Sequence, residues 1–410
     1  MKKLLLVLLI LSLFINHLNA NEKDLQIIQK DKKEYRLLDK ESIQTRQQSQ
    51  KYDWISPIDL SGNIGRNHSF SDENSRNLNN KNTKSASIGF TQSIFESGGI
   101  GFKMDYADNR FKYEMLSWEN QNSQLIYTIY NTLLDIKKLK LEINQNDYRI
   151  VNKDIELIIK KIQYEAGKTD IIELNNAIMS KNLILKEEIA LKNSLKEKEQ
   201  ELAKYTDLKY EEIEILDFQG TQKDIFLDKN YSILEADAKV EMLNSEYKIK
   251  KSQYLPKLSL SAKASYSSQD EKFNSMINDT NKDDASSSGS LILSMPLYDY
   301  TKSSKIQESK IEVLKQKALV NDLKNETAFE YEQIFTKIDT YLKQNETINK
   351  NIKLYEELIG ANQISSEAGM TSKYDLEILE NTKTINEFDI LINKINILQQ
   401  YAKLYFKIKN

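Results

Sequence analysis

Two acidic residues occupy matching positions after the two Glu-Ala-Gly sequences of the chain. Glu173 lies six residues after Gly167, and Asp375 lies six residues after Gly369. An ionised carboxylate is purely a hydrogen-bond acceptor, and it attracts cations. The matching spacing makes these two acids the first candidates for a functional site.

The same residues also have a structural interpretation. Asp170 and Ser372 fit helix N-caps, with Glu173 and Asp375 at the third helical position. The two glycines then fit C-terminal caps of the preceding helices. We therefore expect two tight helical turns, and for the acids both a capping role and a role facing a pore stay open.

Composition excludes most other chemistry. The 410 residues include no Cys and only two His, which excludes disulfides, thiolate metal sites and cysteine nucleophiles. Acidic pairs are abundant because 29% of residues are charged, but none accompanies a nucleophile, a metal cluster or a phosphate-binding loop. The net charge of −3 argues against a nucleic-acid surface, and the mean hydropathy of −0.59 against a helical membrane transporter. We expect no catalytic, cofactor-binding or metal-binding residues and no enzymatic activity.

Long stretches of the chain lack both Gly and Pro, the residues that punctuate turns. Neither occurs between Gly101 and Gly167 or between Pro296 and Gly360, and apolar residues recur there at helical spacing. At ~1.5 Å per residue, a helix filling either stretch would be about 100 Å long. A compact globule of this size has a radius of gyration of only about 21 Å. The sequence therefore predicts an elongated, mainly helical coiled-coil protein, unless points such as Asn144 to Asn146 break the helices.

Ordered sequence matches predict a tandem repeat. Pro57 and Pro256 each open an alternating segment, residues 93–96 match 296–299, and residues 165–169 match 367–371. We expect a first repeat over 21–206, a connector of undefined fold over 207–229, and a second repeat over 230–410. Each repeat begins with a helix. The further elements expected are strands at 56–65, 85–95, 256–266 and 289–298, long helices at 101–165 and 300–360, and helices at 170–206 and 372–408.

The predicted strands alternate between apolar residues and small polar residues. Each is about ten residues long, which suits a tilted transmembrane strand, and a soluble sheet with one buried face is the competing interpretation. Long polar loops at 66–84 and 267–287 lie at the same end of both strand pairs, which favours an outer-membrane protein. Four strands cannot close a barrel, whose smallest examples have about eight. If these strands lie in a membrane, several chains must share one barrel.

The N-terminus has the features of a secretory signal peptide. Lys2 and Lys3 precede an apolar run from Leu4 to Ile15, and Ala20 offers a cleavage site, so residues 1–20 are expected to be removed. An uncleaved anchor is the alternative, but the run is shorter than the ~20 residues of a membrane span. The predicted mature start at Asn21 has no Cys, so we expect no lipid anchor. A cysteine-free exported chain suits the periplasm or outer membrane of a Gram-negative cell.

This layout resembles the TolC-like outer-membrane efflux proteins, or outer membrane factors. The carrying features are the twofold repeat, the Tyr-Leu-Pro-Lys-Leu-Ser-Leu sequence at 254–260, the strand ends at 92–95 and 295–298, and the repeated Glu-Ala-Gly turns. The resemblance implies an α+β, mainly α fold, in which a homotrimer closes a twelve-stranded barrel above a helical periplasmic tunnel. It further implies the exit duct of a tripartite efflux pump or type I secretion system. The partners would be a periplasmic adaptor, an inner-membrane transporter of RND or ABC type, and outer-membrane lipid.

The resemblance also assigns roles at the two turns. They would form the periplasmic tip, where Glu173 and Asp375 from three copies would ring one axis as a constriction that favours cations. Adaptor docking would use Gly167, Lys168, Gly369 and Met370. The family's second tip often carries another acid three residues later, where this chain has Ile378, so a second ring is not implied.

A periplasmic coiled-coil adaptor is the alternative function. Adaptors need Gly-rich lipoyl-like and barrel domains that flank a single hairpin. This chain has no Gly-rich flank, and its predicted hairpins occur twice.

Overall fold

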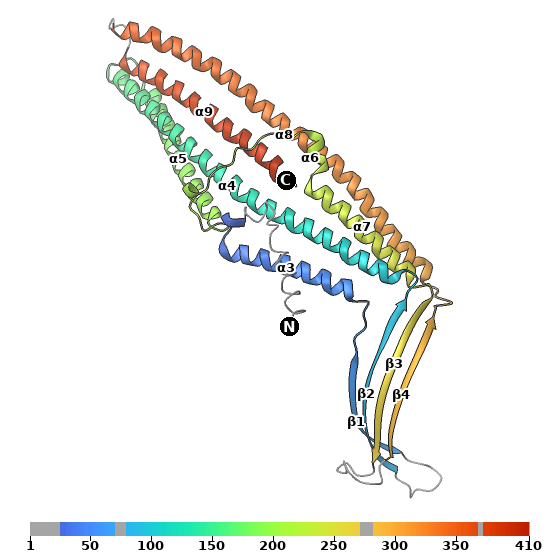
Figure 1. The fold of residues 1–410 in the computed structure, drawn as a ribbon. Coiled ribbons are helices and arrows are strands. Elements are labelled where there is room, and N and C mark those ends of the chain that lie inside the picture. The colour runs from blue at the N-terminus through green and yellow to red at the C-terminus, as the bar shows by residue number, and fades with distance from the viewer. Residues whose placement is uncertain (1–24, 70–78, 271–281, 368–371, 410) are drawn as a thin grey trace, which may run out of the picture. The chain divides into compact units, whose positions relative to one another are not determined.

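The computed structural model describes residues 25–69, 79–270, 282–367 and 372–409. The expected signal peptide therefore lies outside the described residues. Helices make up most of the chain, and four strands form one antiparallel sheet (Figure 1). In chain order the elements are η1 (Leu25–Ile27), α3 (Lys30–Tyr52), β1 (Asp59–Ser69), β2 (Asn79–Phe95), α4 (Gly99–Glu165), α5 (Ile171–Leu202), η2 (Tyr210–Glu212), α6 (Lys223–Asp228), α7 (Tyr231–Ser252), β3 (Lys257–Asp270), β4 (Lys282–Ser294), α8 (Lys302–Glu367) and α9 (Lys373–Phe406).

Two helices are exceptionally long and continuous. Helix α4 has 67 residues and α8 has 66, so each is about 100 Å long at ~1.5 Å per residue. Helix α8 runs seven residues past the predicted end at 360, because Gly360 lies at an exposed position where it does not interrupt the helix. None of the helices in the described ranges has an apolar stretch of the length that a membrane span requires.

The Asn-rich point at 144–146 does not break α4, so the alternative of several shorter helices is wrong here. Gln145 and Asn146 are buried and use their side chains between helices. The Nε2 group of Gln145 donates to the Ile385 carbonyl of α9 at 2.9 Å, and Nδ2 of Asn146 donates to the Ile184 carbonyl of α5 at 3.4 Å. These polar residues therefore fix how α4 pairs with its two neighbours.

The sheet has the order β1-β2-β3-β4, and every neighbouring pair is antiparallel. Strands β2 and β4 begin at Asn79 and Lys282, several residues before the predicted starts at 85 and 289. Strand β4 ends at Ser294, four residues short of the prediction. Pro296 explains this end, because proline has no backbone N–H to donate to a strand ladder.

The chain divides into two compact units that differ from the predicted repeats. Unit 1 comprises the chain up to Lys40, the segment Leu116–Glu235 and the chain from Asn321 onward. Unit 2 comprises the segments Glu41–Met115 and Ala236–Val320. Each unit draws on both predicted repeats, because the long helices α4 and α8 contribute to both units.

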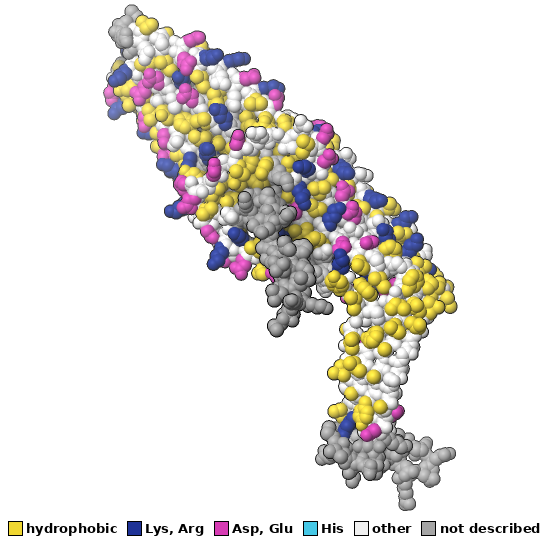
Figure 2. Space-filling view, viewed as in Figure 1, with side chains coloured by type: hydrophobic (Ala, Val, Ile, Leu, Met, Phe, Trp, Pro, Cys, Tyr) yellow, Lys and Arg dark blue, Asp and Glu magenta, His cyan; other side chains and the backbone are white. Residues whose placement is uncertain are grey.

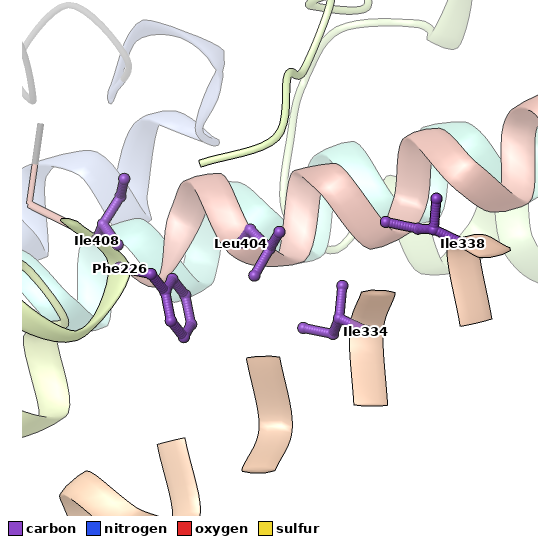
Figure 3. Close-up of a cluster of buried hydrophobic side chains, with 5 residues drawn as sticks. All are labelled: Phe226, Ile334, Ile338, Leu404 and Ile408. Atoms are coloured by element: carbon purple, nitrogen blue, oxygen red, sulfur yellow. The ribbon is translucent and has the colours of Figure 1, made fainter. Parts of the chain in front are cut away.

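The connector, whose fold the sequence pattern does not define, is held in unit 1 by two phenylalanines. Phe226 of α6 packs with Ile334 and Ile338 of α8, and with Leu404 and Ile408 at the end of the chain (Figure 3). Phe218 lies within 5.4–5.6 Å, ring centroid to centroid, of three aromatic rings, those of Tyr130, Tyr405 and Phe406. The irregular backbone of 207–229 is thus anchored by buried aromatic side chains.

A triad of charges ties α8 to the end of the chain. The Glu330 carboxylate accepts hydrogen bonds from Lys403 at 2.8 Å and from Lys407 at 2.6 Å. Burial alone would raise the pKa of Glu330, but the two lysines outweigh it and the pKa is lowered. A carboxylate with a lowered native pKa stabilises the fold above its ordinary pKa, and this contribution is lost as the pH falls through the native value.

We predict that Phe226→Ala lowers the free energy of unfolding by about 3–5 kcal/mol, because it leaves a cavity in the unit 1 core. The matched control is Ile225→Ala, since the neighbouring Ile225 is 43% exposed, and it should cost far less. Denaturant unfolding of the detergent-solubilised protein, followed by circular dichroism, measures both. Equal losses for the two variants would contradict this description of the core.

We also predict that Glu330→Gln destabilises the protein by roughly 1–2 kcal/mol at neutral pH and flattens its loss of stability below the ordinary Glu pKa of about 4.3. Thermal unfolding midpoints measured from neutral to acid pH give both effects. Glu332→Gln is the control, because Glu332 pairs with Lys223 but is 61% exposed. If the parent and Glu330→Gln keep parallel pH profiles, Glu330 does not act as described.

Candidate functional site

The turn between α4 and α5 is a glycine-capped helix end. Gly167 has φ +68°, the left-handed region that glycine adopts without strain. The amide of Lys168 donates to the Gln163 carbonyl at 2.8 Å, and the amide of Gly167 donates to the Tyr164 carbonyl at 3.0 Å. This pair of bonds is the Schellman arrangement, so Gly167 ends α4 and reverses the chain.

Helix α5 begins with a side-chain cap. The Oδ1 atom of Asp170 accepts from the backbone amide of Glu173 at 3.0 Å. The Glu173 side chain does not complete a capping box. It pairs with Lys160 of α4, at 3.0 Å between Oε2 and Nζ. The Glu173 charge is therefore offset within its own chain, a contact that the sequence spacing did not indicate.

The start of α9 differs from the start of α5. Ser372 Oγ accepts from the amide of Tyr374 at 3.2 Å and caps the helix, while Asp375 is exposed. Among the described residues, the Asp375 carboxylate has no ion-pair or hydrogen-bond partner. Gly369 and Met370 lie outside the described residues. Of the two acids selected by spacing, Asp375 is thus the one whose charge no described side chain offsets.

Polar contacts hold the helices together behind these turns. Asn152 of α4 accepts from Asn381 at 2.9 Å and donates to Thr382 at 3.3 Å, both on α9. On the other side, Lys181 of α5 pairs with Asp154 of α4. Farther along, Asn393 of α9 donates to Asn345 of α8 at 2.8 Å. These contacts and those of Gln145 and Asn146 set up a row α5, α4, α9, α8 within unit 1, which Figure 1 shows.

The outer members of this row keep exposed apolar side chains. On α5 these include Ile172, Met179 and Leu183, the last 67% exposed. On α8 they include Leu354 and Ile364, the latter 73% exposed. A chain that leaves such surfaces open on two helices presents apolar area for another protein to cover.

The sheet is a second candidate site because neither face of it is buried. The register puts apolar residues on one face, and several are largely exposed, including Leu60 at 79% and Leu293 at 74%. Figure 2 shows hydrophobic side chains along the strands and gathered at the end where the helices attach. The soluble-sheet interpretation requires a covered apolar face, and this one is open.

The opposite face of the sheet is lined mainly by serine. Hydroxyl groups of neighbouring strands lie 2.8 Å apart for Ser61 and Ser87, and 2.8 Å apart for Ser265 and Ser286. Thr91 and Ser261 lie 3.0 Å apart. We call this surface the serine face.

The sheet also has two free edges. Strand β1 pairs only with β2, and β4 only with β3, within the described ranges. The same ranges contain no group of three or more His, Cys, Asp or Glu side chains that could hold a metal ion. The described part of the chain thus offers an exposed turn at Gly167, an open two-faced sheet and exposed helix surfaces.

Comparison with known proteins agrees with this geometry. Residues 224–403 match the family model described as outer membrane efflux protein. No curated protein matches the sequence.

Several solved structures share the fold at low identity. The outer membrane protein VceC from Vibrio cholerae has a TM-score of 0.71 and 12% identity, with 93% of this chain and 94% of that chain covered. The outer-membrane channel OprN has a TM-score of 0.73 and 9% identity, with 94% and 88% covered. The MtrE outer membrane channel of Neisseria gonorrhoeae has a TM-score of 0.67 and 12% identity, with 91% and 85% covered.

The mainly helical fold with one antiparallel sheet is therefore the fold of known outer-membrane channels, as the resemblance implies. The matched family consists of channels and not of enzymes. The resemblance to the TolC-like proteins is confirmed by the match of residues 224–403 to the outer membrane efflux protein model and by the shared fold.

Proposed function

We propose that three copies of this chain form a passive duct through the outer membrane. The duct is the exit of a tripartite efflux pump or a type I secretion system. It conducts substrates from a periplasmic adaptor and an inner-membrane transporter to the exterior. The mature chain begins at Asn21, after removal of residues 1–20.

The open sheet is the observation that carries this proposal. Its apolar face suits lipid and its serine face suits water, which is the alternation of a transmembrane barrel. Its free edges at β1 and β4 are incompatible with lipid unless another strand pairs with them. Three copies contribute twelve strands, enough to close a barrel in which β4 of each copy pairs with β1 of the next.

The helices support the same assembly. The exposed apolar residues of α5 and α8 lie on the outer members of the helical row, so a neighbouring copy can cover both. At the end of the sheet where the helices attach, Leu297, Tyr298 and Tyr300 are each more than four-fifths exposed. Aromatic residues at this end of the sheet fit the aromatic girdle that transmembrane barrels have at the membrane interface.

The two turns form the periplasmic tip in this proposal. Asp375 from three copies surrounds the axis as a carboxylate ring, and it is the stronger member of the predicted pair because no described side chain offsets its charge. Glu173 lies in the same tip, where Lys160 offsets its charge. The adaptor docks at Gly167, Lys168, Gly369 and Met370.

The adaptor alternative has less support. A monomeric or soluble adaptor would have to cover the apolar face of the sheet, and in this chain that face is open. The residues matched by the efflux-protein model include β3 and β4, two strands of this open sheet.

We expect the mature protein to fractionate with outer membrane, to run as a trimer in mild detergent, and to conduct ions in planar bilayers. We expect this because the exposed apolar surfaces need lipid and neighbouring copies of the chain to cover them. Size-exclusion chromatography with light scattering measures the copy number, and bilayer recording measures conduction. A soluble monomer in the periplasmic extract would overturn the proposal.

We expect Asp375→Asn to weaken block of that conductance by divalent cations, because a ring of three carboxylates binds such ions at the tip. The blocking concentration should rise about tenfold, equivalent to roughly 1.4 kcal/mol. Glu346→Gln makes the same charge change on the exposed surface of α8 and is the control. Equal block in the parent and Asp375→Asn would leave Asp375 outside the constriction.

A further inference from the structure

The serine face carries one long cationic side chain midway along its strands. Between the helix attachments and the loops, this face consists mainly of Ser, Thr, Asn and Gly. Lys263 of β3 is the long cationic side chain in its middle, and it is exposed. Asp59, Asp284 and Ile292 also lie on this face, and Lys257 and Lys282 lie at its two ends. Within the described ranges, no acidic group lies within ion-pair distance of Lys263.

Lys263 belongs to a row of residues that crosses all four strands. The register aligns Asp59 of β1, Gly89 of β2, Lys263 of β3 and Ser288 of β4. Because aligned residues of neighbouring antiparallel strands share a face, the charges of Asp59 and Lys263 lie on either side of Gly89. Strand spacing of about 4.8 Å separates their backbones by roughly 10 Å.

Gly89 makes room for the lysine stem. A Cβ atom at this position would lie 3.3 Å from both Cβ and Cγ of Lys263, and 3.0 Å from the Ala262 carbonyl oxygen. A side chain at position 89 would therefore crowd the lysine stem, and glycine keeps the space between Lys263 and Asp59 open. The two charges and neighbouring hydroxyl groups line one shallow hollow of about 420 Å³.

We propose that this row is the charge-selective ring of the strand channel, and that Lys263 determines its specificity. The inference rests on the proposed trimeric duct, in which the serine face lines the lumen. Three copies then contribute three Lys263 and three Asp59 side chains at one height. The lysine side chain is the longer of the two, so its ammonium groups reach farther toward the axis than the carboxylates do.

The ring favours permeants that carry negative charge and slows those that are purely cationic. Rings of Lys or Arg have this effect in anion-selective pores. The Asp59 carboxylates lie farther from the axis than the ammonium groups, and they weaken this preference for anions. Most of the other side chains in the middle of this face are short, so Lys263 extends farther from the sheet than its neighbours do.

The test measures reversal potentials of single channels in a salt gradient. Lys263→Gln should shift the anion-to-cation permeability ratio toward cations by about threefold at 0.1 M salt, and Asp59→Asn should shift it toward anions. Both shifts should fade at 1 M salt, where the Debye length falls from about 10 Å to about 3 Å. Arg66→Gln is the control, because Arg66 lies on the apolar face by the same register.

A second variant keeps the test independent of folding defects. The chain has no Cys, so Lys263→Cys carries its only thiol. A cationic, membrane-impermeant thiol reagent should restore the parent selectivity, and an anionic reagent should shift it further toward cations. Absence of channels in the parent would count against the proposed function itself. Parent channels whose selectivity ignores Lys263→Gln, Asp59→Asn and both thiol reagents would overturn this inference alone.

Discussion

Strands β1 and β4 each present one edge of backbone N–H and C=O groups that no described strand covers, and the rest of the structure depends on this constraint. An uncovered edge is a template for pairing with another chain, and lipid does not tolerate it. In the proposed duct, each β4 edge is satisfied by the β1 edge of the next copy. The sheet then fixes the number of copies, and the helices joined to its strands take positions around the same axis.

The helices meet a similar requirement in a different way. Helix α4 packs along α5 and α9, and no turn along its length fixes its register with them. The buried side chains of Gln145 and Asn146 fix this register. The side-chain N–H groups of both residues donate to backbone carbonyls of these neighbours, so a sliding helix would leave buried donors unsatisfied. These polar residues suggest a helix break when only the sequence is considered, and in the structure they fix the register between helices.

Much of the fold could be predicted because its signals are periodic and local. The scarcity of Gly and Pro identifies the long helices, and alternation, which Ile292 of β4 interrupts among the apolar positions, identifies both faces of the sheet. The connector could not be predicted, because Phe218 and Phe226 stabilise it through contacts with α4, α8 and the end of α9 that are remote in sequence. Of the candidate site, the spacing of Glu173 and Asp375 and the caps at Asp170 and Ser372 are visible in the sequence. The Lys160 pairing that distinguishes the two acids depends on how α4 lies beside α5.

The hydroxyl pairs of the serine face have a kinetic consequence. When Ser61 and Ser87, or Ser265 and Ser286, bond to each other, one hydroxyl proton of each pair is already engaged. A passing solute finds fewer free donors than an equal number of isolated serines would offer. Rapid passage through a channel requires binding weak enough for release. In the proposed duct, self-paired serines thus give a wettable but weakly adhesive lining, over which a solute has a short residence time.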